Sequence, residues 1–143
     1  MESYASSQIV QAPRSKVFDA ITSRSGLQGW WTPLVDGAGE LGTEWVFGFE
    51  GVDEQIVMRI DETQTAERVR WTCVRHSGLP DWNGTEIVFD LVEHGPDACD
   101  LRLRHLGLTP ALECFDSCQL GWDHFLASIS AFVESGTGMP YRA

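Results

Sequence analysis

The segment from Pro110 to Ser135 constrains the fold more than any other part of this sequence. Its apolar residues recur at alternating spacings of three and four, which places them on one face of an α-helix. Thr109 and Pro110 suit the N-cap and the first helical position, and Gly136 suits the C-terminal stop. A helix of about 25 residues is roughly 37 Å long and needs a second layer to cover its apolar face. That face consists of Phe115, Cys118, Trp122, Phe125, Ile129 and Phe132.

The chain upstream of this helix supplies that layer as a series of strands. Apolar and polar residues alternate along these segments, as they do in an antiparallel sheet with one face in water. Short turns separate the segments, which favours pairing between consecutive strands. We therefore predict a six-stranded, curved antiparallel sheet wrapped around the long helix, an α+β fold. The six predicted strands span residues 4–11, 44–50, 54–63, 68–76, 85–93 and 99–108.

Two short helices are expected between the first two strands. Pro13 fits the first position of a helix that ends near Thr22, and one further helical turn fits residues 23–29. The glycine-rich stretch 34–42 reads as a loop. The pair Trp30-Trp31 follows the second helix, and successive side chains point in different directions on any regular element. We therefore expect at most one of the two rings to be fully buried.

The size and charge of the chain limit its function. Its 143 residues fit a single domain, residues 1–143, and 21 Asp and Glu against 10 Lys and Arg give a formal charge of −11. This charge repels phosphate backbones and anionic lipids, so we expect neither nucleic-acid nor membrane binding. The N-terminal residues do not resemble a secretory signal, and no apolar run could span a bilayer. These features favour a cytoplasmic protein, and we leave open a homodimer.

The four cysteines indicate neither a metal site nor a disulfide. Cys73, Cys99, Cys114 and Cys118 lack the CxxC spacing of zinc sites. Cys114 and Cys118 lie one helical turn apart, but no further ligand stands at a familiar spacing. We expect buried, reduced thiols, no metal and no cofactor.

The predicted inner surface contains many aromatic side chains. Such rings can line a cavity for an apolar ligand, or they can fill a core completely, and periodicity does not distinguish the two. His105 is the one titratable side chain expected to face inward from a strand. His76 and Trp82, with Arg75 and Asp81, could form the rim of an opening. The candidate ligand-binding residues are Trp30, Trp31, Trp45, Phe47, Phe49, Met58, Trp71, Cys73, Phe89, His105, Cys118, Trp122 and Phe125.

The chain resembles the helix-grip superfamily known as SRPBCC or START-like, which includes polyketide cyclases. Within it the sequence is most similar to small proteins related to the activator of heat-shock-protein-ninety ATPase. The similarity rests on Ala12-Pro13 and the following helix, Trp30-Trp31-Thr32-Pro33, the stretch 82–87, the stretch 121–126 and the closing residues 134–140. The resemblance implies a hydrophobic cavity between the sheet and the C-terminal helix, with Trp30 or Trp31 at its entrance.

Three functions remain open at this point. The first is binding of a small hydrophobic molecule, oriented by His105. The second is a cyclase-like or hydrolase-like enzyme, which would need a carboxylate within hydrogen-bond reach of His105. The third, which the family name suggests, is an interaction protein that assists a chaperone ATPase.

Overall fold

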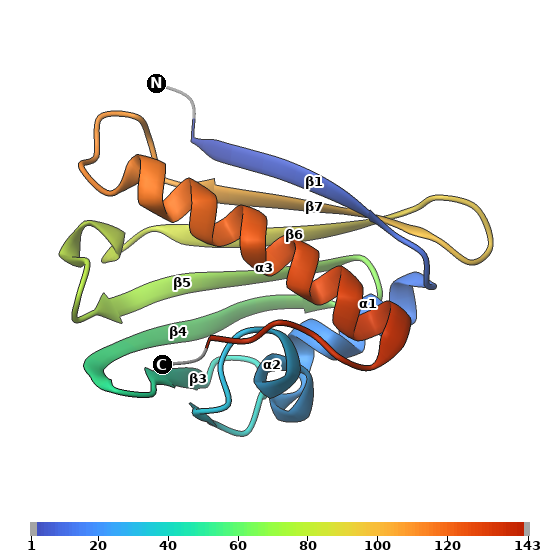
Figure 1. Cartoon of the computed structure of the whole chain (residues 1–143), viewed down its shortest axis with the longest axis horizontal. Helices are drawn as coiled ribbons and strands as arrows, with labels where there is room; N and C mark the ends of the chain where they lie inside the picture. Colours follow the sequence, from blue (N-terminus) through green and yellow to red (C-terminus); the bar gives the residue numbers. More distant parts are fainter. Residues whose placement is uncertain (1–2, 142–143) are drawn as a thin grey trace.

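The computed structural model describes residues 3–141, whose strands form one seven-stranded antiparallel sheet (Figure 1). The strand order is β1-β7-β6-β5-β4-β3-β2, so the first strand lies beside the last. The strands are β1 Tyr4–Val10, β2 Val35–Asp36, β3 Glu44–Phe49, β4 Val52–Gln64, β5 Arg68–His76, β6 Glu86–Glu93 and β7 Cys99–Leu106.

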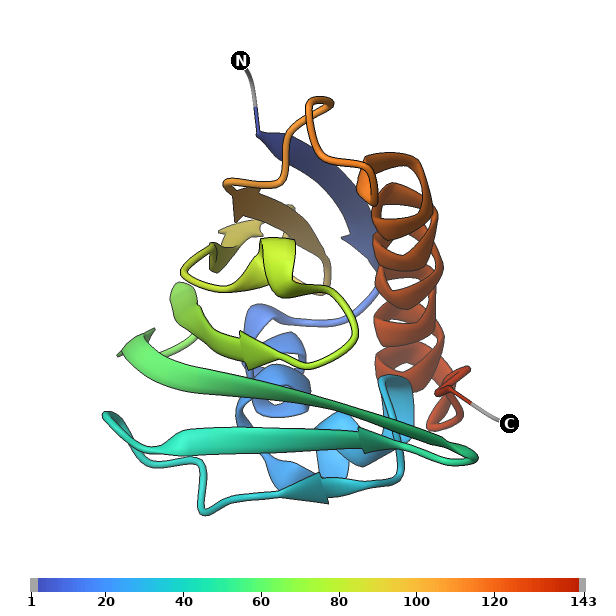
Figure 2. The ribbon, with the colours of Figure 1, turned by 90° about the vertical axis from the view of Figure 1, so that its left-hand side faces the viewer.

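The long helix α3, Phe115–Ser135, lies across the concave face of the curved sheet (Figure 2). The short helices α1, Arg14–Thr22, and α2, Arg24–Trp30, cover one end of the same face. A single 3₁₀ turn, η1, Pro80–Trp82, lies in the connection between β5 and β6. The predicted helix-grip architecture is therefore confirmed.

The predicted side-chain directions on the sheet are confirmed where the alternation is regular. In β7, Leu101, Leu103 and His105 are buried, whereas Arg102 and Arg104 face outward. The Arg104 guanidinium contacts Asp90 at 3.0 Å on the outer face. The inner face thus carries apolar side chains and the outer face carries paired charges, as expected for a sheet with one wet side.

The start of the long helix was predicted incorrectly. α3 begins at Phe115 instead of Pro110, and its N-cap is Cys114, without a side-chain cap. Between β7 and α3 the amide of Leu112 donates to the Thr109 carbonyl, which closes a turn. The chain must reverse direction here to reach the concave face, so residues 109–114 form turns instead of a helical start. The predicted C-terminal stop is correct, because Gly136 adopts a left-handed φ of 86°.

The expectations for the first third of the chain also need correction. Pro13 is the N-cap of α1 instead of its first helical residue. The predicted loop 34–42 contains the short strand β2, so the sheet has seven strands instead of the predicted six. Trp30 and Trp31 are both buried, with exposed fractions of 0% and 3%. Trp31 is the C-cap of α2, and the two rings stack with their centres 5.5 Å apart.

A β-bulge near the end of β5 changes which residues face the interior. Val57 pairs with Arg75, but the next residue of β4, Met58, pairs with Cys73, so β5 has one extra residue at Val74. Such an insertion shifts the alternation of the bulged strand. His76 therefore lies opposite Ile56 on the concave face and is 4% exposed.

The four cysteines are free and buried, as expected. Within residues 3–141, the helices are all too short or too polar to cross a membrane.

Candidate functional site

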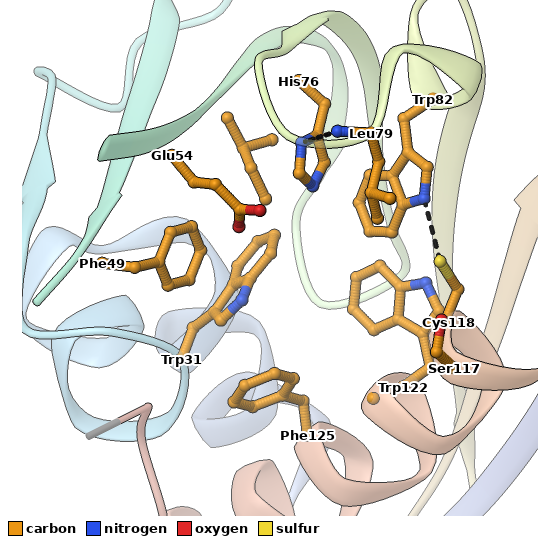
Figure 3. Close-up of a pocket in the computed structure, with 12 residues that line it drawn as sticks. Trp31, Phe49, Glu54, His76, Leu79, Trp82, Ser117, Cys118, Trp122 and Phe125 are labelled. Atoms are coloured by element: carbon orange, nitrogen blue, oxygen red, sulfur yellow. Dashed lines mark hydrogen bonds between the residues drawn. The ribbon is translucent and has the colours of Figure 1, made fainter. Parts of the chain in front are cut away.

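A cavity of about 170 Å³ lies between the N-terminal half of α3, the start of β4 and the end of β5 (Figure 3). The exposed side chains of Glu54 and Ser117 mark its mouth. Most of its remaining surface is aromatic or aliphatic. The lining residues are Trp31, Phe49, Glu54, Ile56, His76, Leu79, Trp82, Ser117, Cys118, Gly121, Trp122 and Phe125.

The helical repeat of α3 forms one side of this cavity. Cys118, Trp122 and Phe125 follow one another at spacings of four and three, so they lie along one face of the helix. Gly121 lies beside them, and a Cβ atom built on it meets no other atom within 4 Å. The space next to this glycine is therefore part of the cavity.

The indole N–H groups of two tryptophans are satisfied within the protein. Trp82 Nε1 donates to Cys118 Sγ at 3.2 Å, and Trp122 Nε1 donates to His105 Nδ1 at 3.0 Å. The two indole rings stack with an angle of 11° between their planes. Because their polar atoms are already paired, these rings offer the cavity mainly apolar surface.

His105 lies behind the cavity and uses both of its nitrogens in structural contacts. Its Nε2 lies 2.9 Å from the Thr85 hydroxyl, which donates its own proton to the Trp82 carbonyl. Nδ1 accepts from Trp122, so only the neutral imidazole with its proton on Nε2 satisfies every bond. Burial, aided by repulsion from His76 when that ring is protonated, lowers the pKa of His105 to about 3. The contacts of His105 are thus those of a core histidine.

His76 differs from His105 because only one of its nitrogens has a partner. Nδ1 accepts hydrogen bonds from the main-chain amides of Gly78, at 3.1 Å, and Leu79, at 2.9 Å. Within residues 3–141 no hydrogen bond is formed by Nε2, and Figure 3 shows the tip of the ring directed into the cavity. Burial lowers the pKa of His76, with Glu54 acting in the opposite direction, so the ring is neutral at pH 7.

Glu54 brings a carboxylate to the same cavity from β4. Its carboxylate lies against Gly78, where an added Cβ would collide with Oε1, and Figure 3 shows the carboxylate directed inward. It forms no ion pair within the described chain. The mouth is therefore negative, whereas the interior carries an uncharged N–H donor.

The structure divides the thirteen predicted ligand-binding residues into two groups. Five of them line the cavity together: Trp31, Phe49, Cys118, Trp122 and Phe125. The other eight are fully or almost fully buried in the surrounding core: Trp30, Trp45, Phe47, Met58, Trp71, Cys73, Phe89 and His105. For example, Trp30 Nε1 donates to the Ala20 carbonyl between α1 and α2, away from the cavity.

Several lining residues were absent from that set. His76 and Trp82 were considered for a rim, and both line the cavity, whereas Arg75 and Asp81 are exposed. Glu54 was not in the predicted set, although it lies two residues before Ile56 and the alternation of the strand places both on the same face. His76 could have been identified from its position at the end of a strand, directly before a turn-rich loop. Binding residues often lie on such loops.

The size of the cavity limits what it can hold. A cavity of about 150 Å³ lined by apolar side chains binds benzene, whereas pockets for drug-sized ligands measure about 300–1,000 Å³. At about 170 Å³ this cavity fits a compound of one or two rings.

Comparison with solved structures identifies similar folds. The solution structure of the Aha1 dimer from Colwellia psychrerythraea is 26% identical, with a TM-score of 0.84, and the match covers 96% of this chain and 100% of that one. CalU16 from Micromonospora echinospora is 22% identical, with a TM-score of 0.70 and coverage of 90% and 72%. DynU16, from the dynemicin biosynthetic locus, is 15% identical, with a TM-score of 0.79 and coverage of 99% and 51%.

The matches to CalU16 and DynU16, at 22% and 15% identity, establish only that the fold is shared. No curated protein sequence matches this chain. The sequence model of one family, described as Activator of Hsp90 ATPase homolog 1-like protein, matches residues 11–134, which is most of the chain. Together with the curved sheet and its C-terminal helix, this match confirms the resemblance to the SRPBCC superfamily. The chain belongs to the Activator of Hsp90 ATPase homolog 1-like family.

Proposed function

We propose that this protein binds a small hydrophobic molecule of one or two rings in the cavity between α3 and the sheet. The observation that carries the proposal is the cavity itself, which lies next to Gly121 and is lined mainly by apolar side chains, among them three tryptophans. Burial of apolar ligand surface contributes about 25 cal/mol per Å². Flat rings of a ligand can stack on Trp31 and Trp122.

The contacts of His105 favour binding over catalysis. An enzyme that uses this histidine as a base would need a free nitrogen and an orienting carboxylate. Both nitrogens are already paired, with Trp122 and Thr85, and neither partner is an acid. A cyclase or hydrolase mechanism through His105 therefore has no support from its surroundings.

The proposal is tested by titration with ethylbenzene, followed by the backbone amide NMR shifts of the protein. We expect saturable shifts around the cavity. Gly121→Leu should abolish them, because its side chain occupies the space that the ligand needs. Gly121→Ala is the matched control, since one added methyl group leaves most of the cavity free.

Circular dichroism and a melting curve establish that both variants are folded. Absence of saturable shifts in the wild type up to the solubility limit of ethylbenzene would contradict the proposal. Binding to Gly121→Leu as strong as to the wild type would also contradict it, because the ligand would then lie elsewhere.

The relative from Colwellia psychrerythraea was solved as a dimer. We propose that this chain also forms a homodimer. Sedimentation equilibrium over a range of concentrations is the test, and a mass of 15.9 kDa at every concentration would rule the dimer out.

A further inference from the structure

We propose that His76 selects an uncharged carbonyl compound by donating a hydrogen bond from Nε2 to the carbonyl oxygen of the ligand. This inference rests on the proposed binding function and specifies the chemical class of the ligand. It concerns the one imidazole nitrogen of the cavity that has no partner among residues 3–141.

The first step of the argument is the tautomer of His76. Two main-chain N–H groups, of Gly78 and Leu79, point at Nδ1, so this nitrogen must present its lone pair. The proton of the neutral ring then resides on Nε2. The turn after β5 thus fixes His76 as a donor toward the cavity and prevents Nε2 from acting as a base.

The second step is the position of this donor. The bulge at Val74 turns His76 to the concave face, and the ring packs edge to face against Trp82 with ring centres 4.9 Å apart. Figure 3 shows the ring next to Leu79, with Trp31 and Trp82 bordering the same cavity. A hydrogen bond formed in a mostly apolar cavity is electrostatically stronger than one formed in bulk water. A ligand that supplies a carbonyl oxygen can accept such a bond from Nε2.

The third step is the charge at the mouth. The Glu54 carboxylate points into the same space and is not paired with a cation within the described residues. It repels an anionic ligand such as an aromatic acid. A ketone, an aldehyde or another neutral carbonyl compound meets the donor without this repulsion.

The test compares acetophenone with ethylbenzene, which has the same carbon skeleton but no carbonyl oxygen. Because water hydrates a carbonyl better than a methylene, the informative quantity is the ratio of the two dissociation constants in wild type and variant. His76→Asn retains an oxygen near the place of Nδ1 for the two amides but has no group at the place of Nε2. We expect the affinity for acetophenone relative to ethylbenzene to fall about two- to tenfold in this variant.

Glu54→Gln tests the charge at the mouth. We expect it to raise the affinity for benzoate relative to ethylbenzene about three- to tenfold at low salt. An equal ratio of the two affinities in wild type and variant would overturn the role of Glu54.

A measurement on the wild type does not depend on the variants. The Nε2 proton and nitrogen resonances of His76 should shift on addition of acetophenone and remain in place on addition of ethylbenzene. If ethylbenzene binds but the ratio of affinities and the His76 resonances do not respond, the role of His76 is overturned and the binding function stands. If neither compound binds, the binding function itself fails.

Discussion

Acid should destabilise this protein through His105 well before its carboxylates are protonated. In the unfolded chain a histidine binds a proton below about pH 6.5, whereas burial in the fold lowers the pKa of His105 to about 3. Between these two values the unfolded state binds more protons, so stability falls as the pH falls. Each pH unit below 6.5 costs about 1.4 kcal/mol. Acidification from pH 7 to pH 5 should therefore lower the free energy of unfolding by about 2 kcal/mol through His105, and His76, whose pKa burial also lowers, adds to the loss in the same direction.

Urea unfolding followed by far-ultraviolet circular dichroism at several pH values measures this loss. With an m-value of about 2 kcal/mol per M, the midpoint should move by about 1 M between pH 7 and pH 5. His105→Gln is the reference variant, because glutamine can both donate and accept a hydrogen bond but does not titrate.

The variant starts from a lower stability at pH 7, since it disturbs the bonds to Trp122 and Thr85. Its loss between pH 7 and pH 5 should nevertheless be smaller than that of the wild type by about 2 kcal/mol. Equal losses in the two proteins would show that His105 is not the group responsible, and the reasoning from its burial would be wrong.

Three further substitutions have effects of defined sign. Gly121→Ala should raise the free energy of unfolding by up to about 1 kcal/mol, because alanine favours the helix and its Cβ meets no atom within 4 Å. Gly26→Ala should lower it by about 1–3 kcal/mol, since its Cβ would lie 2.5 Å from the Ala20 carbonyl oxygen. Thermal unfolding measures the change in stability of both glycine variants. A change of the same sign in the two variants would contradict this account. Ser128→Ala should lower the free energy of unfolding in urea by about 1–3 kcal/mol. The reason is that the Ser128 hydroxyl links the Trp30 carbonyl to the main-chain amide of Met139. A loss below about 0.5 kcal/mol would count against this link.

The elements whose patterns are regular could be predicted from the sequence. The faces of β7 and the apolar stripe of α3 were correct because burial of one side imposes a period of two or of 3.6. The start of α3 was wrong because Thr109 and Pro110 suit a helix locally, whereas the reversal after β7 requires turns there. Tertiary geometry overrides a local preference of this size.

The candidate site was less accessible to sequence reasoning. Alternation identifies which side chains face inward, but it does not state which of them touch one another and which border empty space. Trp45 and Trp122 have similar patterns, yet only Trp122 lines the cavity. His76 faces inward because of an extra residue in its strand, and a bulge leaves no regular trace in the pattern.

The bulge in β5 has a consequence for comparison within the family. Without it, a strand in regular register would point Arg75 inward and His76 to water, and the cavity would receive a permanent cation. The number of residues between Cys73 and His76 therefore specifies the chemistry of the cavity as much as their identity does. When relatives are aligned, a gap of one residue at this place equates positions on opposite sides of the sheet. In a search for relatives that bind the same ligand, the extra residue of the bulge is the first feature to compare, and the histidine is the second.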